Sequence, residues 1–297
     1  MSNLPYETTG QTFGEGDTFL VQNILPEDLA ASAFDDLQNE VGWNVMHHRG
    51  GEVPRLVAVE GQVNDDGSFP IYRHPADSSP PLLSFSPTVS KIRQRVEEVL
   101  KHPVNHVLIQ HYRHGGDYIS EHSDKTIDVV KGTKIVNVSI GAQRTMVLRT
   151  KKDAALESNE DRETQRIPLP HNSMFVMGLE TNKKWMHGIR QDKRMPTLKL
   201  PSEVAFNCER ISLTFRNIGT FLTKDETRIY GQGATGKTKD EAKDVVNGTD
   251  EAGKLIMAFG DENHRSDFDW DETYGRGFDV LHFAPGNTSD SLVGPPS

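Results

Sequence analysis

Five short segments with alternating side chains follow Pro103, and they restrict the fold more than any other feature of the chain. In one of them, Val136, Val138 and Ile140 alternate with polar residues, which is the pattern of a β-strand with one buried face. Gly, Pro or charged residues separate the segments, which span residues 105–112, 134–142, 144–150, 172–179 and 210–218. We therefore expect a β-sandwich or jelly roll, with the charged stretch 151–166 as a loop between strands.

Two helices are predicted ahead of these strands. The segment 26–41 has apolar residues at helical spacing, with Pro26 in its first turn. The segment 86–102 has the same spacing, and Ser86 and Pro87 stand at its N-cap and first helical positions. Helices followed by many strands indicate an α+β protein.

Charge is distributed unevenly along the chain. The 297 residues carry a formal net charge of −10, which argues against a wholly basic nucleic-acid binder. The acidity lies mostly in the tail, because residues from Lys224 onward include 15 acidic and 8 basic side chains, against 28 and 25 before them. We expect one domain at 1–223 and an acidic, Gly-rich extension at 224–297, with one candidate strand at 278–283.

The sequence does not predict a membrane or secreted protein. It has no run of about 18 apolar residues, and its first residues lack the basic start and apolar run of a secretory signal. Cys208 is the single cysteine and cannot form an internal disulfide. We expect an intracellular protein, in the cytoplasm or nucleus, without an obligate protein partner.

The extension contains a P-loop pattern, in which Gly231 is followed after four residues by Gly236, Lys237 and Thr238. A working P-loop needs a buried strand before the glycines and a helix whose N-terminus faces the phosphates. The preceding TKDETRIY is too charged for such a strand, and the following KDEAKDVVNG is short for such a helix. We interpret the match as accidental.

A stronger candidate site lies among the predicted strands. His122 and Asp124 form the one His-x-Asp or His-x-Glu pattern, and residues two apart on a strand project from the same face. His187 follows several strands later. Two histidines and one carboxylate can bind Fe(II) and leave positions open for a co-substrate and O2. The alternative is a surface histidine beside a turn-forming aspartate.

Two arginines support a site between the strands. Arg210 and Arg216 share one face of the segment 210–216, opposite Ile211, Leu213 and Phe215. Arginines on the inner face of a barrel require anions, and a dicarboxylate such as 2-oxoglutarate fits between two guanidinium groups. The alternative is a solvated strand edge with two exposed arginines.

The order of four segments resembles the AlkB family of Fe(II)/2-oxoglutarate dioxygenases, especially its eukaryotic DNA- and RNA-repair members. The segments are IQHYRHGGDYISEHSDK, IVNVSIGAQRTMVLR, LPHNSMFVMGLETNKKWMHGI and RISLTFR. The resemblance covers residues 50–220 and implies a double-stranded β-helix, a form of jelly roll. Flanking helices and a lid would occupy 1–103 and the core 104–223, and the extension stays unexplained.

The resemblance implies roles for individual residues. His122, Asp124 and His187 would be the iron ligands. Arg210 would hold the distal carboxylate of 2-oxoglutarate, and Arg216 would help to position its keto-acid end.

Further roles follow from the same resemblance. Tyr112 matches the tyrosine of the family's Asn-x-Tyr motif, which contacts 2-oxoglutarate, and Gln110 replaces the asparagine. Arg55, in VPR, resembles the start of the nucleotide-recognition lid of the repair enzymes. Tyr72 falls near their base-stacking aromatic residues.

One departure concerns the base. Repair enzymes of this kind carry an acidic residue four positions after the first iron histidine, where it meets the cationic methylated base. Thr126 occupies that position here, and Asp128 is the nearest candidate acid.

Three functions fit these patterns. The first is oxidative demethylation of N-alkylated bases in DNA or RNA, with Fe(II), 2-oxoglutarate and O2. In the second, the same chemistry hydroxylates or desaturates a small-molecule metabolite, for which Thr126 and the acidic balance are no handicap. The third is a jelly-roll binding module without activity.

Overall fold

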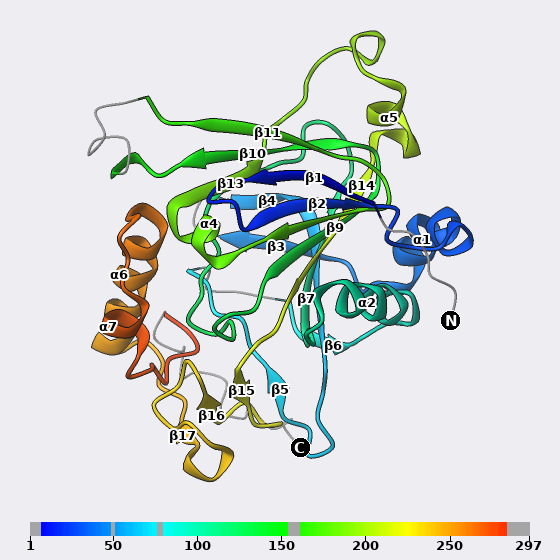
Figure 1. Cartoon of the computed structure of the whole chain (residues 1–297). Coiled ribbons are helices and arrows are strands. Elements are labelled where there is room, and N and C mark those ends of the chain that lie inside the picture. The colour runs from blue at the N-terminus through cyan, green and yellow to red at the C-terminus, as the bar shows by residue number, and fades with distance from the viewer. Residues whose placement is uncertain (1–6, 49–50, 76–79, 154–160, 284–297) are drawn as a thin grey trace, which may run out of the picture.

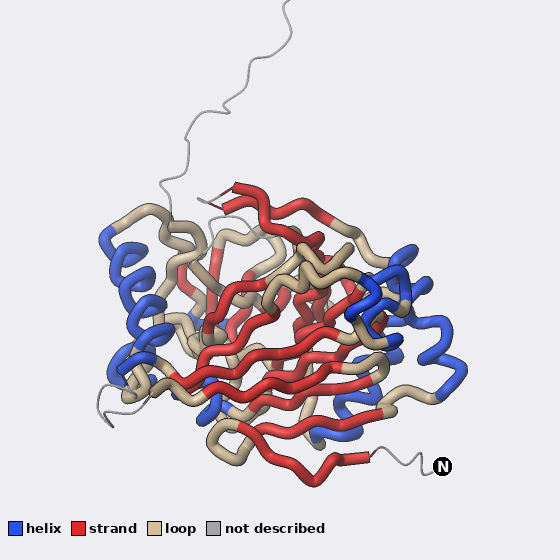
Figure 2. The backbone as a smooth tube through the Cα atoms, turned by 90° about the horizontal axis from the view of Figure 1, so that it is seen from above, coloured by secondary structure: helices blue, strands red, loops and turns tan. Residues whose placement is uncertain are grey.

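The computed structural model describes residues 7–48, 51–75, 80–153 and 161–283 of the chain. Within these ranges, a large sheet and a smaller sheet pack face to face, and helices lie at both sides of the strands (Figure 1, Figure 2). The predicted α+β, jelly-roll-like architecture is confirmed. None of the helices in these ranges combines the length and apolarity needed to cross a bilayer.

Among the described residues, the large sheet has nine strands. Neighbouring strands are antiparallel, except that β6 (Leu82–Ser84) runs parallel to β4. Its order is β1 (Glu7–Phe13), β2 (Thr18–Gln22), β12 (Ser173–Met177), β9 (Ile135–Gly141), β14 (Arg210–Arg216), β7 (His106–Tyr112), β4 (Gly51–Gly61) and β3 (Asn44–His48). Four of these strands, β7, β9, β12 and β14, match segments predicted from the alternation of side chains.

The smaller sheet carries the fifth predicted strand, and its order is β11 (Thr164–Leu169), β10 (Arg144–Thr150), β13 (Trp185–Ile189) and β8 (Ile119–His122). A short helix, α4 (Leu179–Lys184), leads into β13. Apolar side chains of both sheets, such as Phe175 and Leu148, form the core between them. A cavity lined by residues of both sheets lies between them.

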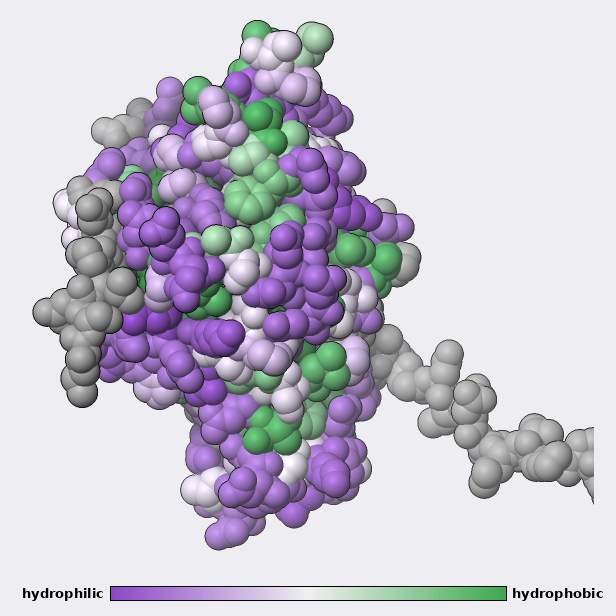
Figure 3. Space-filling view, turned by 90° about the vertical axis from the view of Figure 1, so that its right-hand side faces the viewer, coloured by the Kyte–Doolittle hydropathy of each residue, from purple (hydrophilic) through white to green (hydrophobic). Residues whose placement is uncertain are grey.

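The two predicted helices are present as α1 (Glu27–Glu40) and α2 (Pro87–Leu100), and they cover the outer face of the large sheet. Ser86 occupies the N-cap of α2, but its amide and hydroxyl donate to Glu60 instead of capping the helix. The Glu40 carboxylate accepts from the amide and hydroxyl of Thr88 in the first turn of α2. The surface on this side of the molecule is largely hydrophilic, with small hydrophobic patches (Figure 3).

The described part of the extension packs against the sandwich. A small sheet has the order β17 (Lys243–Asp244), β16 (Arg228–Gly231), β15 (Thr220–Leu222) and β5 (Phe69–Pro70), and it is followed by α6 (Asp250–His264) and α7 (Trp270–Tyr274). In the candidate strand 278–283, one isolated bridge joins Val280 to Val246. Other short elements are α5 (Pro201–Val204) and 3-10 turns at Pro196–Leu198, Phe206–Cys208 and Lys239–Glu241.

The P-loop-like stretch folds as a closed turn. Its lysine, Lys237, donates to the backbone oxygens of Ala234 at 2.7 Å and Gln232 at 3.1 Å, so its ammonium group is already occupied. A three-residue 3-10 turn follows, where a P-loop requires a helix. The stretch therefore lacks the geometry of a phosphate cradle.

Candidate metal and co-substrate site

Two histidines meet at the edge of the smaller sheet. His122 on β8 and His187 on β13 are direct partners in the strand register, and their ring centres lie 4.4 Å apart. His122 Nδ1 lies 2.8 Å from the backbone oxygen of Ser120. Because a carbonyl only accepts, Nδ1 carries the proton and Nε2 is free to bind a metal.

The third candidate ligand is placed differently from the sequence expectation. β8 ends at His122, so Asp124 lies beyond the strand and not two residues along it. Asn182 fixes the Asp124 backbone, because its amide oxygen accepts from Asp124 N at 2.8 Å and its amide nitrogen donates to Asp124 O at 2.9 Å. The carboxylate is thereby held opposite the two imidazoles.

The three residues form a compact cluster. One candidate ligand atom from each lies within 4.8 Å of the others, and Asp124 Oδ1 is 3.6 Å from His122 Nε2 and 3.5 Å from His187 Nε2. Burial alone would raise the pKa of Asp124, but Arg216 and the histidines hold it well below its ordinary value. Burial lowers the pKa of His187. The cluster therefore offers a charged carboxylate and a neutral imidazole, the forms that bind metals.

Arg216 is committed to this cluster. Its Nε and Nη2 donate to Asp124 Oδ2 at 2.9 and 2.5 Å, and both side chains are 3% exposed. The ring of Tyr72 covers the guanidinium at 4.0 Å, and the Tyr72 hydroxyl accepts from Lys125 N. The structure thus places Tyr72 against the metal cluster and Arg216 on its aspartate.

Arg210 lies at the other end of β14, facing the same cavity as the cluster. Its Nη2 donates to Asn137 Oδ1 and Ser139 Oγ, two polar residues of β9 that no pattern in the sequence singles out. Nε and Nη1 are buried and have no partner in the described part of the chain. Burial lowers the pKa of Arg210 to about 10, so it stays charged at neutral pH. A buried cation with two free donors matches a carboxylate ligand.

Gln110 and Tyr112 lie beside Arg210 on β7, which pairs with β14. With the amide of Gln110 turned so that its oxygen faces Arg55, that oxygen accepts from Arg55 Nε at 2.8 Å and the amide nitrogen donates to Tyr112 Oη at 3.2 Å. Arg55 also donates to Tyr118 O. The structure brings Arg55, expected in a lid over the base, next to the predicted co-substrate residues.

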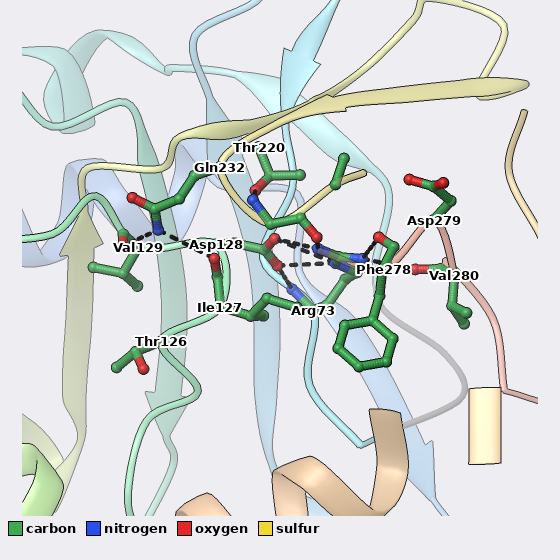
Figure 4. Close-up of polar contacts among 12 residues, drawn as sticks. Arg73, Thr126, Ile127, Asp128, Val129, Thr220, Gln232, Phe278, Asp279 and Val280 are labelled. Atoms are coloured by element: carbon green, nitrogen blue, oxygen red, sulfur yellow. Dashed lines mark hydrogen bonds and ion pairs between the residues drawn. The ribbon is translucent and has the colours of Figure 1, made fainter. Parts of the chain in front are cut away.

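Thr126 and Asp128 do not line this cavity. The amide and hydroxyl of Thr126 both donate to Glu262 on α6. Asp128 is fully buried and binds Arg73, which donates to it from Nε and Nη2 (Figure 4). The expectation that Asp128 faces a cationic base therefore gains no support, because its carboxylate is occupied elsewhere.

These residues fit an iron ion and a dicarboxylate. His, Asp and His in one cluster are the donor set of non-haem Fe(II) oxygenases. Arg210, whose Nε and Nη1 have no hydrogen-bond partner among the described residues, lines the same cavity. The three candidate metal ligands and Arg210 therefore line one cavity, as binding of an iron ion together with a dicarboxylate requires.

The chain is similar in sequence to known oxygenases. The sequence profile of the 2OG-Fe(II) oxygenase superfamily matches residues 17–216. The DNA oxidative demethylase ALKBH2 of Homo sapiens is 34% identical over 138 residues, which are 46% of this chain and 48% of the relative. The alpha-ketoglutarate-dependent dioxygenase alkB homolog 3 of Bos taurus is 27% identical over 220 residues, which are 72% of this chain and 70% of the relative.

The chain spans about half the length of the ALKBH2 relatives that it matches, 48% of the human and 51% of the Mus musculus protein. Among solved structures, OsALKBH1 aligns with a TM-score of 0.45 and 15% identity, over 72% of this chain and 100% of that chain. The predicted resemblance to AlkB proteins is confirmed by these sequence relatives.

Proposed function

The chain belongs to the 2OG-Fe(II) oxygenase superfamily, and on this premise we propose that it removes alkyl groups oxidatively from N-alkylated bases of nucleic acid. The observation that carries the chemistry is the His122–Asp124–His187 cluster facing the same cavity as the unpartnered donors of Arg210. The substrate class rests on relatives named DNA oxidative demethylase.

The chain's own residues have separate tasks in this proposal. His122, Asp124 and His187 would hold Fe(II), and Arg210 would bind the distal carboxylate of 2-oxoglutarate. When bound, these groups supply an O2-dependent hydroxylation of a C–H bond, with CO2 and succinate as the other products. Arg216 keeps the Asp124 carboxylate ionised and turned toward the imidazoles.

Demethylation follows from hydroxylation of an N-methyl group. The N–CH2OH product breaks its N–C bond: the base nitrogen keeps the electron pair, the hydroxyl group loses its proton, and formaldehyde leaves. The opening lies on the side of His122, because its side chain is 32% exposed while that of Asp124 is 3% exposed. A base reaches such a recessed cluster only from a single strand or after flipping out of a duplex. A nucleic-acid substrate would place the activity in the cytoplasm or nucleus.

Succinate and formaldehyde release test the proposal. The purified chain with Fe(II), 2-oxoglutarate and O2 is given oligonucleotides that contain 1-methyladenine or 3-methylcytosine, and in parallel a panel of small metabolites. We expect both products from the methylated strands and none with His187→Ala. Turnover of a metabolite with no formaldehyde from any oligonucleotide would replace this proposal with small-molecule hydroxylation.

A further inference from the structure

The segment after residue 216 lies outside the range that the family profile matches, yet it touches the metal cluster's own loop. We propose that Glu262 and Asn263 of α6 are positioning residues for the metal site. This inference rests on the proposed function. They hold residues 123–126, the backbone that carries Asp124, and thereby set the metal affinity.

Asn263 holds the residues on both sides of Asp124. Its Oδ1 accepts from Ser123 N at 3.0 Å and lies 3.3 Å from Lys125 Nζ. The Ser123 hydroxyl also donates to the backbone oxygen of Glu262 at 3.2 Å. One amide oxygen of α6 therefore fixes the chain immediately before the candidate ligand.

Glu262 holds the next turn of the same loop. Its Oε1 accepts from Thr126 N at 2.9 Å and from the Thr126 hydroxyl, while Oε2 accepts from the Tyr274 hydroxyl at 2.8 Å. Glu262 is 3% exposed, and both carboxylate oxygens are engaged. It does not line the metal cavity, so it supports the loop and does not contact a substrate base.

The end of α6 is itself fixed to the sandwich. Lys151 follows β10, is fully buried, and donates through Nζ to the backbone oxygens of Glu262 at 2.6 Å and Arg265 at 3.3 Å. These carbonyls lie in the last turn of the helix and just after it, where a cation is favoured. The buried Lys151 therefore fixes the end of α6 that carries Glu262 and Asn263.

The extension fastens the rest of the loop as well. Gln232 Nε2 donates to the backbone oxygens of Ile127 at 3.1 Å and Val129 at 2.6 Å (Figure 4).

Arg73, the partner of Asp128, also donates to the backbone oxygens of Phe278 and Val280 (Figure 4). Trp270 Nε1 donates to Thr126 O at 3.1 Å. The backbone of Asp124 is thus hydrogen-bonded to Asn182, and the loop that carries Asp124 is hydrogen-bonded to residues of the extension.

Partners that orient metal ligands typically contribute about ten- to a hundredfold to metal affinity. Asn263 and Glu262 hold neighbours of Asp124 and not a ligand side chain, so we expect Asn263→Ala and Glu262→Ala each to weaken Co²⁺ binding at the lower end of this range, by about tenfold. Co²⁺ serves as the probe because it accepts the same nitrogen and oxygen ligands and can be titrated by absorbance without turnover.

Two further variants separate positioning from general destabilisation. In Glu262→Gln, the amide oxygen can still accept from Thr126 and the amide nitrogen can donate to Tyr274, so we expect Co²⁺ affinity close to wild type. Ile229→Ala removes a buried side chain of the same extension, in a cluster away from residues 123–126, and we expect its Co²⁺ affinity to be unchanged. Circular dichroism first establishes that every variant is folded at the titration temperature.

The chain of residues 1–297 is used for all titrations. Wild-type affinity in folded Asn263→Ala and Glu262→Ala would overturn the positioning role and leave the proposed metal site intact. Equal weakening in Ile229→Ala would also overturn it, because the effect would then be unspecific. Wild-type protein that binds no Co²⁺ would overturn the metal site itself, and with it this inference.

Discussion

Arg216 donates two hydrogen bonds to one carboxylate oxygen of Asp124, and the other oxygen faces both His122 and His187. The arginine therefore fixes which oxygen is presented to a metal. It also compensates a charge that is almost completely buried.

Removing this arginine should destabilise the protein. Arg216→Met leaves Asp124 as an uncompensated buried charge, and breaking a buried pair in this way costs about 3–5 kcal/mol. Urea denaturation at pH 7 measures the change in the free energy of unfolding. A loss below about 1 kcal/mol would show that Asp124 does not depend on this pair.

Arg210→Lys should weaken binding of 2-oxoglutarate. Lysine keeps a positive charge but loses the planar fork, whose Nε and Nη1 have no partner in the described chain. We expect an increased KM for 2-oxoglutarate and a smaller effect on the melting temperature. Direct titration with the co-substrate in the absence of O2 provides the check, and an unchanged affinity would exclude Arg210 as its anchor.

His106 should make stability depend on pH. Burial and the nearby Arg216 lower the pKa of His106 to about 3, against an ordinary value of 6.5. Between these values the unfolded chain takes up a proton that the folded chain excludes, so stability is lost as the pH falls from 6.5 toward 3. His106→Phe should reduce the slope of unfolding free energy against pH by up to about 1.4 kcal/mol per pH unit in this window.

The comparison with wild type cancels contributions from the other histidines. Both proteins are unfolded with urea at intervals between pH 4 and pH 8. The two curves should run parallel above pH 7 and separate below it. Parallel curves over the whole range would mean that folding does not lower the pKa of His106.

Thr126→Glu should be harmful. Sequence reasoning alone favours a gain, because the substitution restores an acid at the position where repair enzymes carry one. In the structure, however, Thr126 donates twice to the buried Glu262, so a second carboxylate would lie beside the first. We expect a larger loss of stability than in Thr126→Val, which removes only the hydroxyl, and no increase in formaldehyde release. A more active Thr126→Glu protein would contradict this placement.

The alternation of side chains predicted the part of the site that lies on strands. Arg210 and Arg216 were expected on one face of their strand because their spacing is even, and apolar Leu213 lies on the other face in the helix-covered core. The two helices could also be predicted from a local pattern, because their apolar residues recur at helical spacing.

Contacts between distant residues could not be predicted in this way. Arg73 meets Asp128 across 55 positions and Arg216 meets Asp124 across 92, and no local pattern contains such pairs. The helix α6 has buried Leu255, Phe259 and Glu262 at helical spacing, which is a signal that was available. The glycines in that segment lower its helix propensity. Glutamate is usually exposed, so the sequence alone does not predict that Glu262 is buried.

The most direct test of the central claim is the yield of formaldehyde per succinate from a single-stranded oligonucleotide with one 1-methyladenine. If the chain is an oxidative demethylase, the ratio should be close to one, the unmethylated strand should give no formaldehyde, and His187→Ala should give neither product. Succinate that forms at the same rate with or without the methyl group, and no formaldehyde, would contradict the claim.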